Sequence, residues 1–440
     1  MLDILAFLLT LTGFGLFLKN PINLGYLVGA LTSLFVLLPL LIYDYLSADF
    51  IAYSMEQLSL VSVSVLSTTK LYVVAIGAFW LAGAAFAGAQ PLLGQKTITA
   101  KKTELASGRV IILLVLTWSV YSAAVLGSGL SIMELFTPSA KYDIEFLGSA
   151  YVEGLVIATP TAAACLVVSI RRKIDWLSLL SLASALAIAM GTAQRRNILI
   201  VMTAFMICAI FARVARGKAL SPEKLNSKLK RYVIIALPML SLLGPLLWYA
   251  RNYFTVLNKT GSANIDFTLQ VRGFSELFFG SAATAYPTTA MVVEMQRETY
   301  MSLGSSFYFL FASPIPRAIW PSKPENPAST LIQYYNLDFS PSTFFATEIV
   351  MNFAELGPLV AFFMAYALVR HSQKLMTSSD ALRTTAASYP IRNQIMFAFL
   401  VGQSLLLFKN GFTLFILNLG IWYAISWIVF SFSTMRAPNV

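Results

Sequence analysis

Charged residues are scarce in this sequence. Asp, Glu, Lys and Arg make up 12% of its 440 residues, against 58% hydrophobic residues, whereas roughly a quarter of the residues of a soluble protein are charged. An ordinary cytosolic enzyme is therefore excluded. Because runs of about 20 apolar residues are long enough to cross a bilayer, the sequence predicts an all-α polytopic membrane protein.

Histidine and cysteine are almost absent as well. The chain has one histidine, His371, and two cysteines, Cys165 and Cys208, which both lie in apolar runs. These residues are too few for a disulfide framework or for a zinc site built from His and Cys. The segments predicted below to be external contain no histidine and no tight group of carboxylates, so we expect no metal and no other cofactor.

The excess of basic residues does not indicate nucleic acid. The net charge is +11, but most Lys and Arg residues lie in short segments between apolar runs, where orientation in the membrane accounts for them. We therefore expect membrane lipids, and no nucleic acid, among the partners.

Eleven apolar runs are candidates for membrane-spanning helices. They cover residues 2–18, 24–43, 71–89, 110–127, 150–170, 176–192, 197–213, 232–250, 345–369, 394–409 and 412–432. The first run begins without a positive charge and leads into a second run without a clear cleavage site, so we expect it to stay in the mature protein. Segments 274–293 and 303–313 are apolar enough to be re-entrant or interfacial.

The basic residues divide unevenly between the two sides of these spans. The segments 96–109, 171–173, 213–231 and 370–392, together with Lys19 and Arg436, carry most of them. The short segments of the opposite side carry Lys70, Lys141, Arg195, Arg196 and Lys409. Since basic residues concentrate in short cytoplasmic loops, we expect the N-terminus outside and the C-terminus inside.

Three consecutive parts follow from this topology. Residues 1–250 hold eight spans, residues 251–343 form a long external loop, and residues 344–440 hold three more spans. The loop carries aromatic residues, balanced charges and six prolines between Pro314 and Pro341, a composition unlike that of a disordered tail. We expect it to fold onto the external ends of the helices and to carry much of the function.

Two arginines lie at the turn between the sixth and seventh spans, on the side that is otherwise poor in positive charge. They are Arg195 and Arg196, in the string Gln194-Arg195-Arg196 at the start of a predicted helix. Guanidinium groups at an external membrane face suit a lipid-linked phosphate or diphosphate, because their planar forks bind phosphate oxygens in pairs. The alternative is snorkelling to ordinary lipid head groups.

A proline-rich string in the loop holds two more cations. In Pro314 to Glu325, prolines flank Arg317 and Lys323 and restrict the backbone beside Trp320. A stiff scaffold of this kind preorganises a binding site, and Trp320 is suited to stacking on a sugar ring or to anchoring at the interface. The alternative is a loop closure without chemistry.

A polar stripe is predicted at the start of the ninth span. Glu348, Asn352 and Glu355 are spaced i, i+4 and i+7, hence on one face of a single helix. We expect this face to point into the protein, with Glu348 near the external mouth as a candidate general base and Glu355 deeper as a structural partner.

These pieces together resemble the oligosaccharide repeat-unit polymerases of bacterial surface polysaccharides, the O-antigen and capsule polymerases. The resemblance rests on Pro-Arg-x-x-Trp-Pro-x-Lys-Pro at residues 316–324 and on the Thr/Glu/Asn-Phe segment around Glu348 and Asn352. Gln194 and Arg195 also resemble the helix start shared with the O-antigen ligases. Two features depart from the pattern: Ala354 stands where glycine is expected after Asn-Phe, and no histidine is external.

The resemblance implies a GT-C-like glycosyltransferase of the bacterial inner membrane. It would transfer a growing glycan from undecaprenyl diphosphate onto an incoming lipid-linked repeat unit at the periplasmic face, alongside flippase and chain-length regulator proteins. Arginines without a metal would stabilise the leaving diphosphate, and an external carboxylate would act as base. The resemblance implies that Arg195, Arg196 and Arg317 bind the leaving diphosphate, that Arg251 and Arg272 bind the second diphosphate, and that Glu348 is the base. Alternative candidates for the base are Glu276, Glu294, Glu298 and Asp338.

Other classes of protein fit part of this pattern. An O-antigen ligase-like transferase shares the lipid-linked substrate, but the missing external histidine disfavours it. A transporter or flippase of lipid-linked sugars would also need external arginines and many helices, together with internal repeats or broken helices. A structural scaffold of an export complex would leave the external arginines unexplained.

Overall fold

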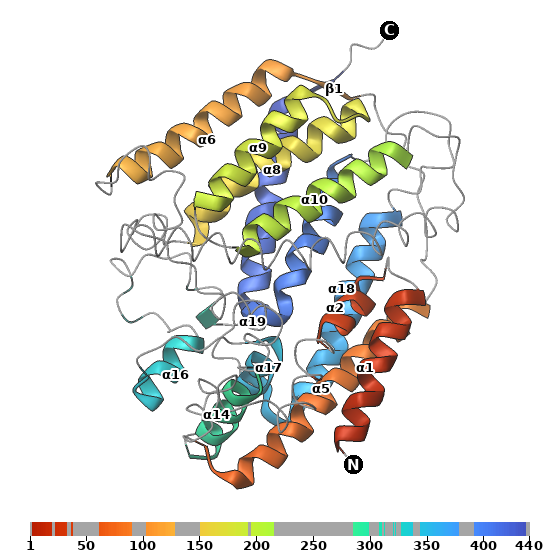
Figure 1. Cartoon of the computed structure of the whole chain (residues 1–440), viewed down its shortest axis with the longest axis vertical. Coiled ribbons are helices and arrows are strands. Elements are labelled where there is room, and N and C mark those ends of the chain that lie inside the picture. Colours follow the sequence, from red (N-terminus) through yellow and green to blue (C-terminus); the bar gives the residue numbers. More distant parts are fainter. Residues whose placement is uncertain are drawn as a thin grey trace, which may run out of the picture. The chain divides into compact units, whose positions relative to one another are not determined.

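The computed structural model describes most of the apolar part of the chain. The described residues are 2–19, 23–32, 61–89, 103–127, 150–191, 195–214, 285–298, 327–337, 344–377 and 391–436, with the single positions 37, 308, 309, 312, 320 and 322. These residues are almost entirely helical (Figure 1).

The helices have the following bounds. They are α1 (Leu2–Lys19), α2 (Leu24–Thr32), α5 (Val63–Ala89), α6 (Ser107–Gly127), α8 (Ala150–Arg171), α9 (Trp176–Gly191), α10 (Arg195–Val214), α14 (Ala285–Glu298), α16 (Pro327–Tyr335), α17 (Phe345–Phe353), the short 3-10 helix η5 (Ala354–Leu356), α18 (Gly357–Thr377) and α19 (Ile391–Ser433). Two three-residue strands, β1 (Thr103–Leu105) and β2 (Thr434–Arg436), pair antiparallel.

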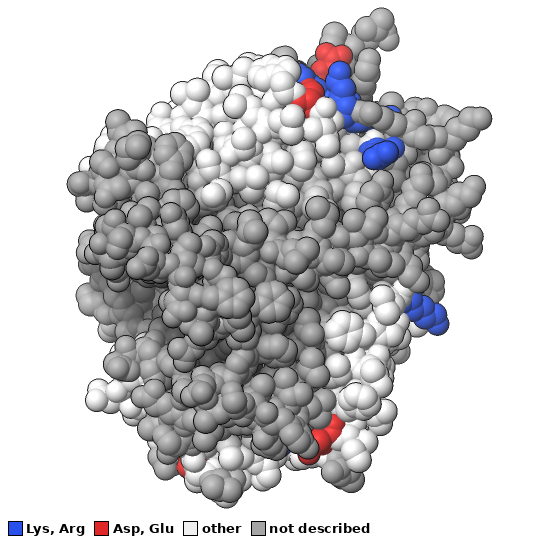
Figure 2. All heavy atoms as spheres, viewed as in Figure 1, with Lys and Arg blue, Asp and Glu red and all other residues white. Residues whose placement is uncertain are grey.

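The coarse fold class is confirmed, because the described residues form an α-helical protein suited to a membrane. They contain six helical segments long and apolar enough to cross a bilayer, one of which, Phe345–Leu375, is interrupted by η5, and α1 and α6 expose large apolar side chains such as Ile4 and Val115, which are 66% and 59% exposed. On the face drawn in Figure 2 most of the described surface is uncharged. The predicted span at 232–250 lies outside the described residues.

The long helix α19 is a helical hairpin. Its backbone leaves the helical conformation at Gly411, with φ 75° and ψ 171°, and the rings of Phe399 and Trp422 lie 4.7 Å apart on either side of this break. A continuous helix would separate those residues by about 34 Å, so the chain reverses at Gly411. The two predicted spans 394–409 and 412–432 correspond to the two arms of this hairpin.

The chain divides into two compact units assembled from separated segments. Unit 1 comprises Met1–Pro91, Phe267–His371 and Ser404–Leu417, and unit 2 comprises Leu92–Asp266, Ser372–Gln403 and Asn418–Val440. The tip of the α19 hairpin thus belongs to unit 1 and its arms to unit 2.

Unit 1 is built around α5. A Cβ atom added at Gly25 of α2 would overlap Ala84 of α5 and Val369 of α18, so glycine here allows three helices to approach closely, as is common inside membranes. The fully buried Trp80 of α5 donates its indole N–H to the Gly25 carbonyl oxygen at 3.3 Å. Its ring packs edge to face on Phe345, with ring centroids 5.1 Å apart, which fixes the start of α17.

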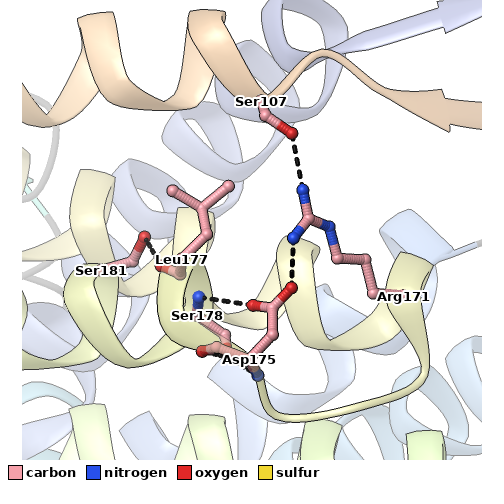
Figure 3. A network of polar contacts seen from close by, with 6 residues as sticks. All are labelled: Ser107, Arg171, Asp175, Leu177, Ser178 and Ser181. Atoms are coloured by element: carbon pink, nitrogen blue, oxygen red, sulfur yellow. Dashed lines mark hydrogen bonds and ion pairs between the residues drawn. The ribbon is translucent and has the colours of Figure 1, made fainter.

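Unit 2 is built around α8, whose side chains from Ala162 to Val168 are fully buried. Helices α6, α9 and α10 pack on it. At one end of this unit Arg171 donates to the Asp175 carboxylate and, at 2.6 Å, to the Ser107 hydroxyl (Figure 3). Asp175 also accepts the backbone N–H of Ser178 at 3.0 Å, which caps the start of α9.

Three basic segments meet at this end of unit 2. Besides the Arg171 contact, Arg109 donates to the Phe432 carbonyl oxygen at 3.1 Å, and Arg436 pairs with Thr103 across the two strands. Residues 103–109, 171–175 and 432–436 therefore lie together. This agrees with the prediction that these segments share one side of the membrane, for the described residues 103–109, 171–173 and Arg436.

Candidate functional site

The residues of the polymerase-like segment come together on α17, a helix of nine residues. Apolar side chains and the Trp80 contact place its first turn in the core of unit 1, and the backbone N–H of Glu348 bonds to the Phe344 carbonyl oxygen at 2.9 Å. All side chains from Phe345 to Asn352 are buried. A helix of this length is about 13 Å long, less than half of the hydrocarbon core of a bilayer.

The direction of α17 is opposite to that of α5. Phe345, at the start of α17, packs on Trp80. Gly357 then approaches Ile349 and Ile76, at 2.9 and 3.8 Å from the position of an added Cβ. Helix α17 therefore rises toward the N-terminal end of α5.

Helix α18 then runs back along α5. A Cβ added at Gly83 would overlap the Phe362 carbonyl, and the ring of Phe86 lies 6.1 Å from those of Phe362 and Tyr366. Helices α17 and α18 therefore form a helical hairpin, with η5 as its turn.

This geometry corrects two predictions. The run 345–369 is not one helix, because Ala354 adopts φ 45° and ends α17, so Glu355 leaves the face of Glu348 and Asn352 and is exposed. The predicted order of depth is also wrong: along α5, Glu355 lies nearer the predicted external end than α17 does. Gly357-Pro358 is the signal in the sequence for the break, since proline cannot donate the helical hydrogen bond to residue 354.

Glu348 ties α17 to the tip of the α19 hairpin. Its carboxylate, on a residue that is 3% exposed, accepts through Oε2 the backbone N–H of Phe412 and, at 2.9 Å, that of Thr413. These N–H groups begin the second arm of α19 and have no partner within that arm. A carboxylate also complements the positive end of a helix dipole, so Glu348 acts as an N-terminal cap supplied from another helix.

Asn352 and Thr347 complete a buried polar cluster around Glu348. The Asn352 amide, fully buried, donates to the Glu348 carbonyl oxygen at 2.6 Å. The Thr347 hydroxyl bonds with that of Thr289 on α14 at 2.8 Å. Polar groups inside a membrane protein are costly unless paired, and this cluster pairs them across three elements.

Helix α14 connects this cluster to the predicted loop. Gln296 donates to the carbonyl oxygens of Val350 and Met351, at 2.8 and 3.1 Å, in the last turn of α17, where the Val350 carbonyl also accepts the backbone N–H of Ala354. Tyr335 of α16 donates to the Met291 carbonyl oxygen at 2.8 Å. Figure 1 shows α14 beside α17. Helix α14 lies in the segment 251–343 and overlaps the stretch 274–293 predicted to be re-entrant or interfacial.

Sequence reasoning missed a second polar group on the outer side of α14. Arg297, exposed, donates to the hydroxyls of Ser64 and Thr68 on α5, at 3.2 and 3.1 Å. Glu294, one of the rival bases, accepts the backbone N–H and the hydroxyl of Ser62, at 3.4 and 3.0 Å. No local motif marks Arg297, because its partners are more than 200 positions away in the sequence.

The other predicted site residues are distributed as follows. Arg195 and Arg196 are the first residues of α10, which confirms the predicted helix start, and Trp320 is half-buried. Arg251, Arg272, Arg317, Lys323, Glu276 and Asp338 lie outside the described residues. Of the predicted set, the structure thus brings together Glu348 and Asn352. Within the described ranges no three His, Cys, Asp or Glu side chains are grouped in a way that would hold a metal ion.

Comparison with known proteins found no relative of this chain. No family model matches the chain, and no curated protein and no solved structure matches it.

Proposed function

We propose that this chain polymerises oligosaccharide repeat units carried on undecaprenyl diphosphate into a surface polysaccharide, at the periplasmic face of the bacterial inner membrane. The observation that carries the proposal is the buried polar cluster of α17. Glu348 and Asn352, from the segment that resembles the polymerases, form a paired cluster linked through α14 to the loop that holds the rest of the resemblance.

In the proposed reaction one glycosidic bond replaces another. The bond between the anomeric carbon of the growing glycan and its diphosphate oxygen breaks, and a bond forms to a hydroxyl oxygen of the incoming unit. The hydroxyl proton goes to the Glu348 carboxylate, which the N–H groups of Phe412 and Thr413 hold in place. Asn352 holds the helix turn that carries this carboxylate.

The diphosphate gains negative charge as it leaves, and the proposal assigns its stabilisation to Arg317 and Arg195. Substrate binding is assigned to Arg196, Arg251, Arg272, Trp320, Lys323 and Asn352. Eleven spans, a GT-C-like architecture, a periplasmic N-terminus and a cytoplasmic C-terminus belong to the same proposal, as do flippase and chain-length regulator proteins as partners.

One structural feature favours a second candidate, a transporter of lipid-linked sugars. Short re-entrant helices and interrupted spans near the middle of the membrane are typical of transporter sites. The half-helix α17 and the break at Gly411 of α19 are features of this kind.

Deletion of the gene separates these functions. Surface polysaccharide and lipid-linked intermediates are analysed by electrophoresis and by their sidedness in spheroplasts. Loss of a polymerase leaves single repeat units on the lipid anchor, outside the membrane, and restoration by a plasmid copy supports the proposal. Units retained inside indicate the transporter, and long chains not attached to the lipid anchor indicate a ligase.

A further inference from the structure

The connection between α8 and α9 carries two exposed cations at one end of unit 2. It comprises residues 172–175, and the side chains of Arg172 and Lys173 are exposed. The membrane-crossing part of α8 ends at Arg171, so this connection lies at the level where lipid head groups meet the hydrocarbon. Trp176, the first residue of α9, is 61% exposed, and tryptophan is enriched at that level.

Ion pairing and hydrogen bonds anchor this connection on both sides (Figure 3). Arg171 pairs with the Asp175 carboxylate and donates to the Ser107 hydroxyl at 2.6 Å. Asp175 accepts the backbone N–H of Ser178 at 3.0 Å and donates its own backbone N–H to the Ser178 hydroxyl at 2.9 Å. The charges of Arg171 and Asp175 therefore compensate each other, and the two cations between them are presented from a fixed scaffold.

Arg172 occupies a backbone conformation that favours glycine. Its φ is 53°, in the left-handed region, directly after the end of α8, where glycine is the usual residue. An arginine makes this conformation less favourable than a glycine would. Because strained residues concentrate at functional sites, the reason for an arginine here lies in its side chain.

The remaining charges at this end leave an excess of positive charge. Arg109 of α6 is turned to Phe432, donating to its carbonyl oxygen at 3.1 Å with the guanidinium carbon 5.8 Å from the ring centroid. Besides Asp175, the carboxylate described at this end is Glu104 of β1, which is exposed. With the three cations of residues 171–173, the described side chains carry more positive than negative charge, which favours an anionic ligand.

An apolar stripe continues from the connection into the membrane. Trp176, Leu179 and Leu180 follow at i, i+3 and i+4 on α9, hence on one face, and are 61%, 51% and 45% exposed. From the end of unit 2 inward, the order of groups is therefore cation, indole and hydrocarbon. A phospholipid has the matching order, with the phosphate outermost, the glycerol esters next and the acyl chains innermost. An acidic soluble partner would match the cations but not the stripe.

We propose that Arg172 and Lys173, with the apolar stripe of α9, bind phosphatidylglycerol, a phospholipid whose head group carries one negative charge on its phosphate. The Arg172 guanidinium takes two phosphate oxygens, and the Lys173 ammonium adds a second positive charge. The indole N–H of Trp176 donates to a glycerol ester carbonyl, and an acyl chain lies on the two leucines. The site belongs to unit 2 and is independent of the proposed polymerase.

The test measures lipid binding to the purified full chain by native mass spectrometry, together with thermal unfolding in detergent. The probes are phosphatidylglycerol, zwitterionic phosphatidylethanolamine with the same acyl chains, and inorganic phosphate. We expect wild type to bind phosphatidylglycerol about tenfold more tightly than phosphatidylethanolamine. Phosphatidylglycerol should also raise the unfolding temperature, since a ligand of the folded state stabilises it.

The variant Arg172→Gly separates lipid binding from folding. Glycine suits φ 53°, and this relief offsets the greater freedom of the unfolded chain, so the lipid-free unfolding temperature should stay near that of wild type. Its affinity for phosphatidylglycerol should fall about tenfold, the loss of one charge-assisted contact. Arg172→Gln, which keeps the Cβ atom, should lose affinity equally, and Lys173→Gln should lose about fivefold.

The matched control is Lys19→Gln. Lys19 is an exposed cation at the end of α1, beside Leu18, which is 49% exposed, and it is predicted to lie on the same side of the membrane. It is not accompanied by a second cation in α1, so phosphatidylglycerol binding should not change.

Four outcomes would overturn the site. Equal affinity of wild type, Arg172→Gly and Arg172→Gln would remove Arg172 from it. A loss of the same size in Lys19→Gln would reduce it to a general attraction between basic residues and head groups. Phosphatidylethanolamine bound as tightly as phosphatidylglycerol would exclude recognition of charge, and displacement of the lipid by inorganic phosphate would make it a site for free phosphate.

Discussion

In the part of the chain that the structure describes, two carboxylates cap helix N-termini, one in each unit, and they differ in how far along the sequence their partners lie. Asp175 directly precedes α9 and accepts the N–H of Ser178, three residues on. Glu348 accepts the N–H groups of Phe412 and Thr413, 64 and 65 residues on. The first cap forms wherever α9 forms, whereas the second exists only when α17 and the α19 tip have been assembled.

The surroundings of the two caps differ too. The Asp175 side chain is 11% exposed beside Arg171, at an end of unit 2 where basic segments gather. Its burial would raise the carboxyl pKa, but hydrogen bonds from Ser178 and the Arg171 guanidinium outweigh this and lower the pKa below its usual value. Glu348 is held by backbone dipoles instead, inside unit 1. The long-range cap should therefore be the more sensitive to substitution.

Removing the Glu348 carboxylate should have the largest effect. Glu348→Ala leaves two buried N–H groups without this acceptor, at about 1–3 kcal/mol for each, so we expect a loss of about 3 kcal/mol and no long polysaccharide. Glu348→Gln keeps an oxygen for both donors but cannot accept a proton, so thermal stability in detergent should stay near wild type while polymerisation stops. Glu104→Gln, an exposed carboxylate of β1, is the control.

Of the two variants, Glu348→Gln better separates a catalytic role of Glu348 from a structural one. A normal chain-length distribution at matched membrane levels would show that Glu348 only holds the α19 tip. Stability as low as that of Glu348→Ala would show that the cap needs the charge.

Gly411→Ala should have the second largest effect. The conformation at φ 75° and ψ 171° is essentially restricted to glycine and costs other residues about 1–3 kcal/mol. The substitution should therefore lower stability by about 2 kcal/mol by displacing the N–H groups that Glu348 caps. Gly420 of the same helix has open space around its Cβ position, so Gly420→Ala should be neutral or slightly stabilising. Thermal unfolding that is equal for both variants would contradict this account of the turn.

The local cap should matter less. Asp175→Ala should cost about 1 kcal/mol, the usual value for an N-cap. Because the folded pKa of Asp175 is lowered, its contribution is fully present above the unfolded pKa and is lost as pH falls through the folded value. The stability difference between wild type and Asp175→Asn should thus be constant from pH 7 to about 5 and shrink below about pH 4. A difference that grows on acidification would contradict the sign.

Features set by local spacing were predictable from the sequence. Apolar runs predicted the arms of the α19 hairpin on either side of Gly411, because each arm fills its own stretch of membrane. The distribution of basic residues predicted that 96–109, 171–173 and Arg436 share one side. The pattern Asp175-x-x-Ser178 is likewise a readable N-cap signal.

Features set by contacts between distant segments were not predictable in this way. The apolar run 345–369 outweighed the break signal Gly357-Pro358, so the reversal of α17 and the outward position of Glu355 were missed. Hydropathy gives the length of an apolar segment but not its direction, and α17 is too short to require a crossing. The partners of Glu348 on α19, and of Arg297 on α5, follow from tertiary packing alone.

The smallest predicted effect is at Ala354, and it should be a gain. The backbone there, with φ 45° and ψ −119°, suits glycine, the residue that the polymerase resemblance leads one to expect. Ala354→Gly should relieve strain of about 1 kcal/mol, while glycine also makes the unfolded chain more flexible, so we expect a net stabilisation of about 0.5 kcal/mol with the cap at Glu348 intact.

The matched control is Ala367→Gly, at an exposed position inside α18, where the same change in a regular helix should cost about 1 kcal/mol. Opposite shifts of the thermal unfolding midpoint in detergent would show that α17 ends in a strained turn held by its surroundings. Two shifts of the same sign would mean that residues 345–369 prefer the continuous helix first predicted from the sequence, and the difference between the two caps would then lose its structural basis.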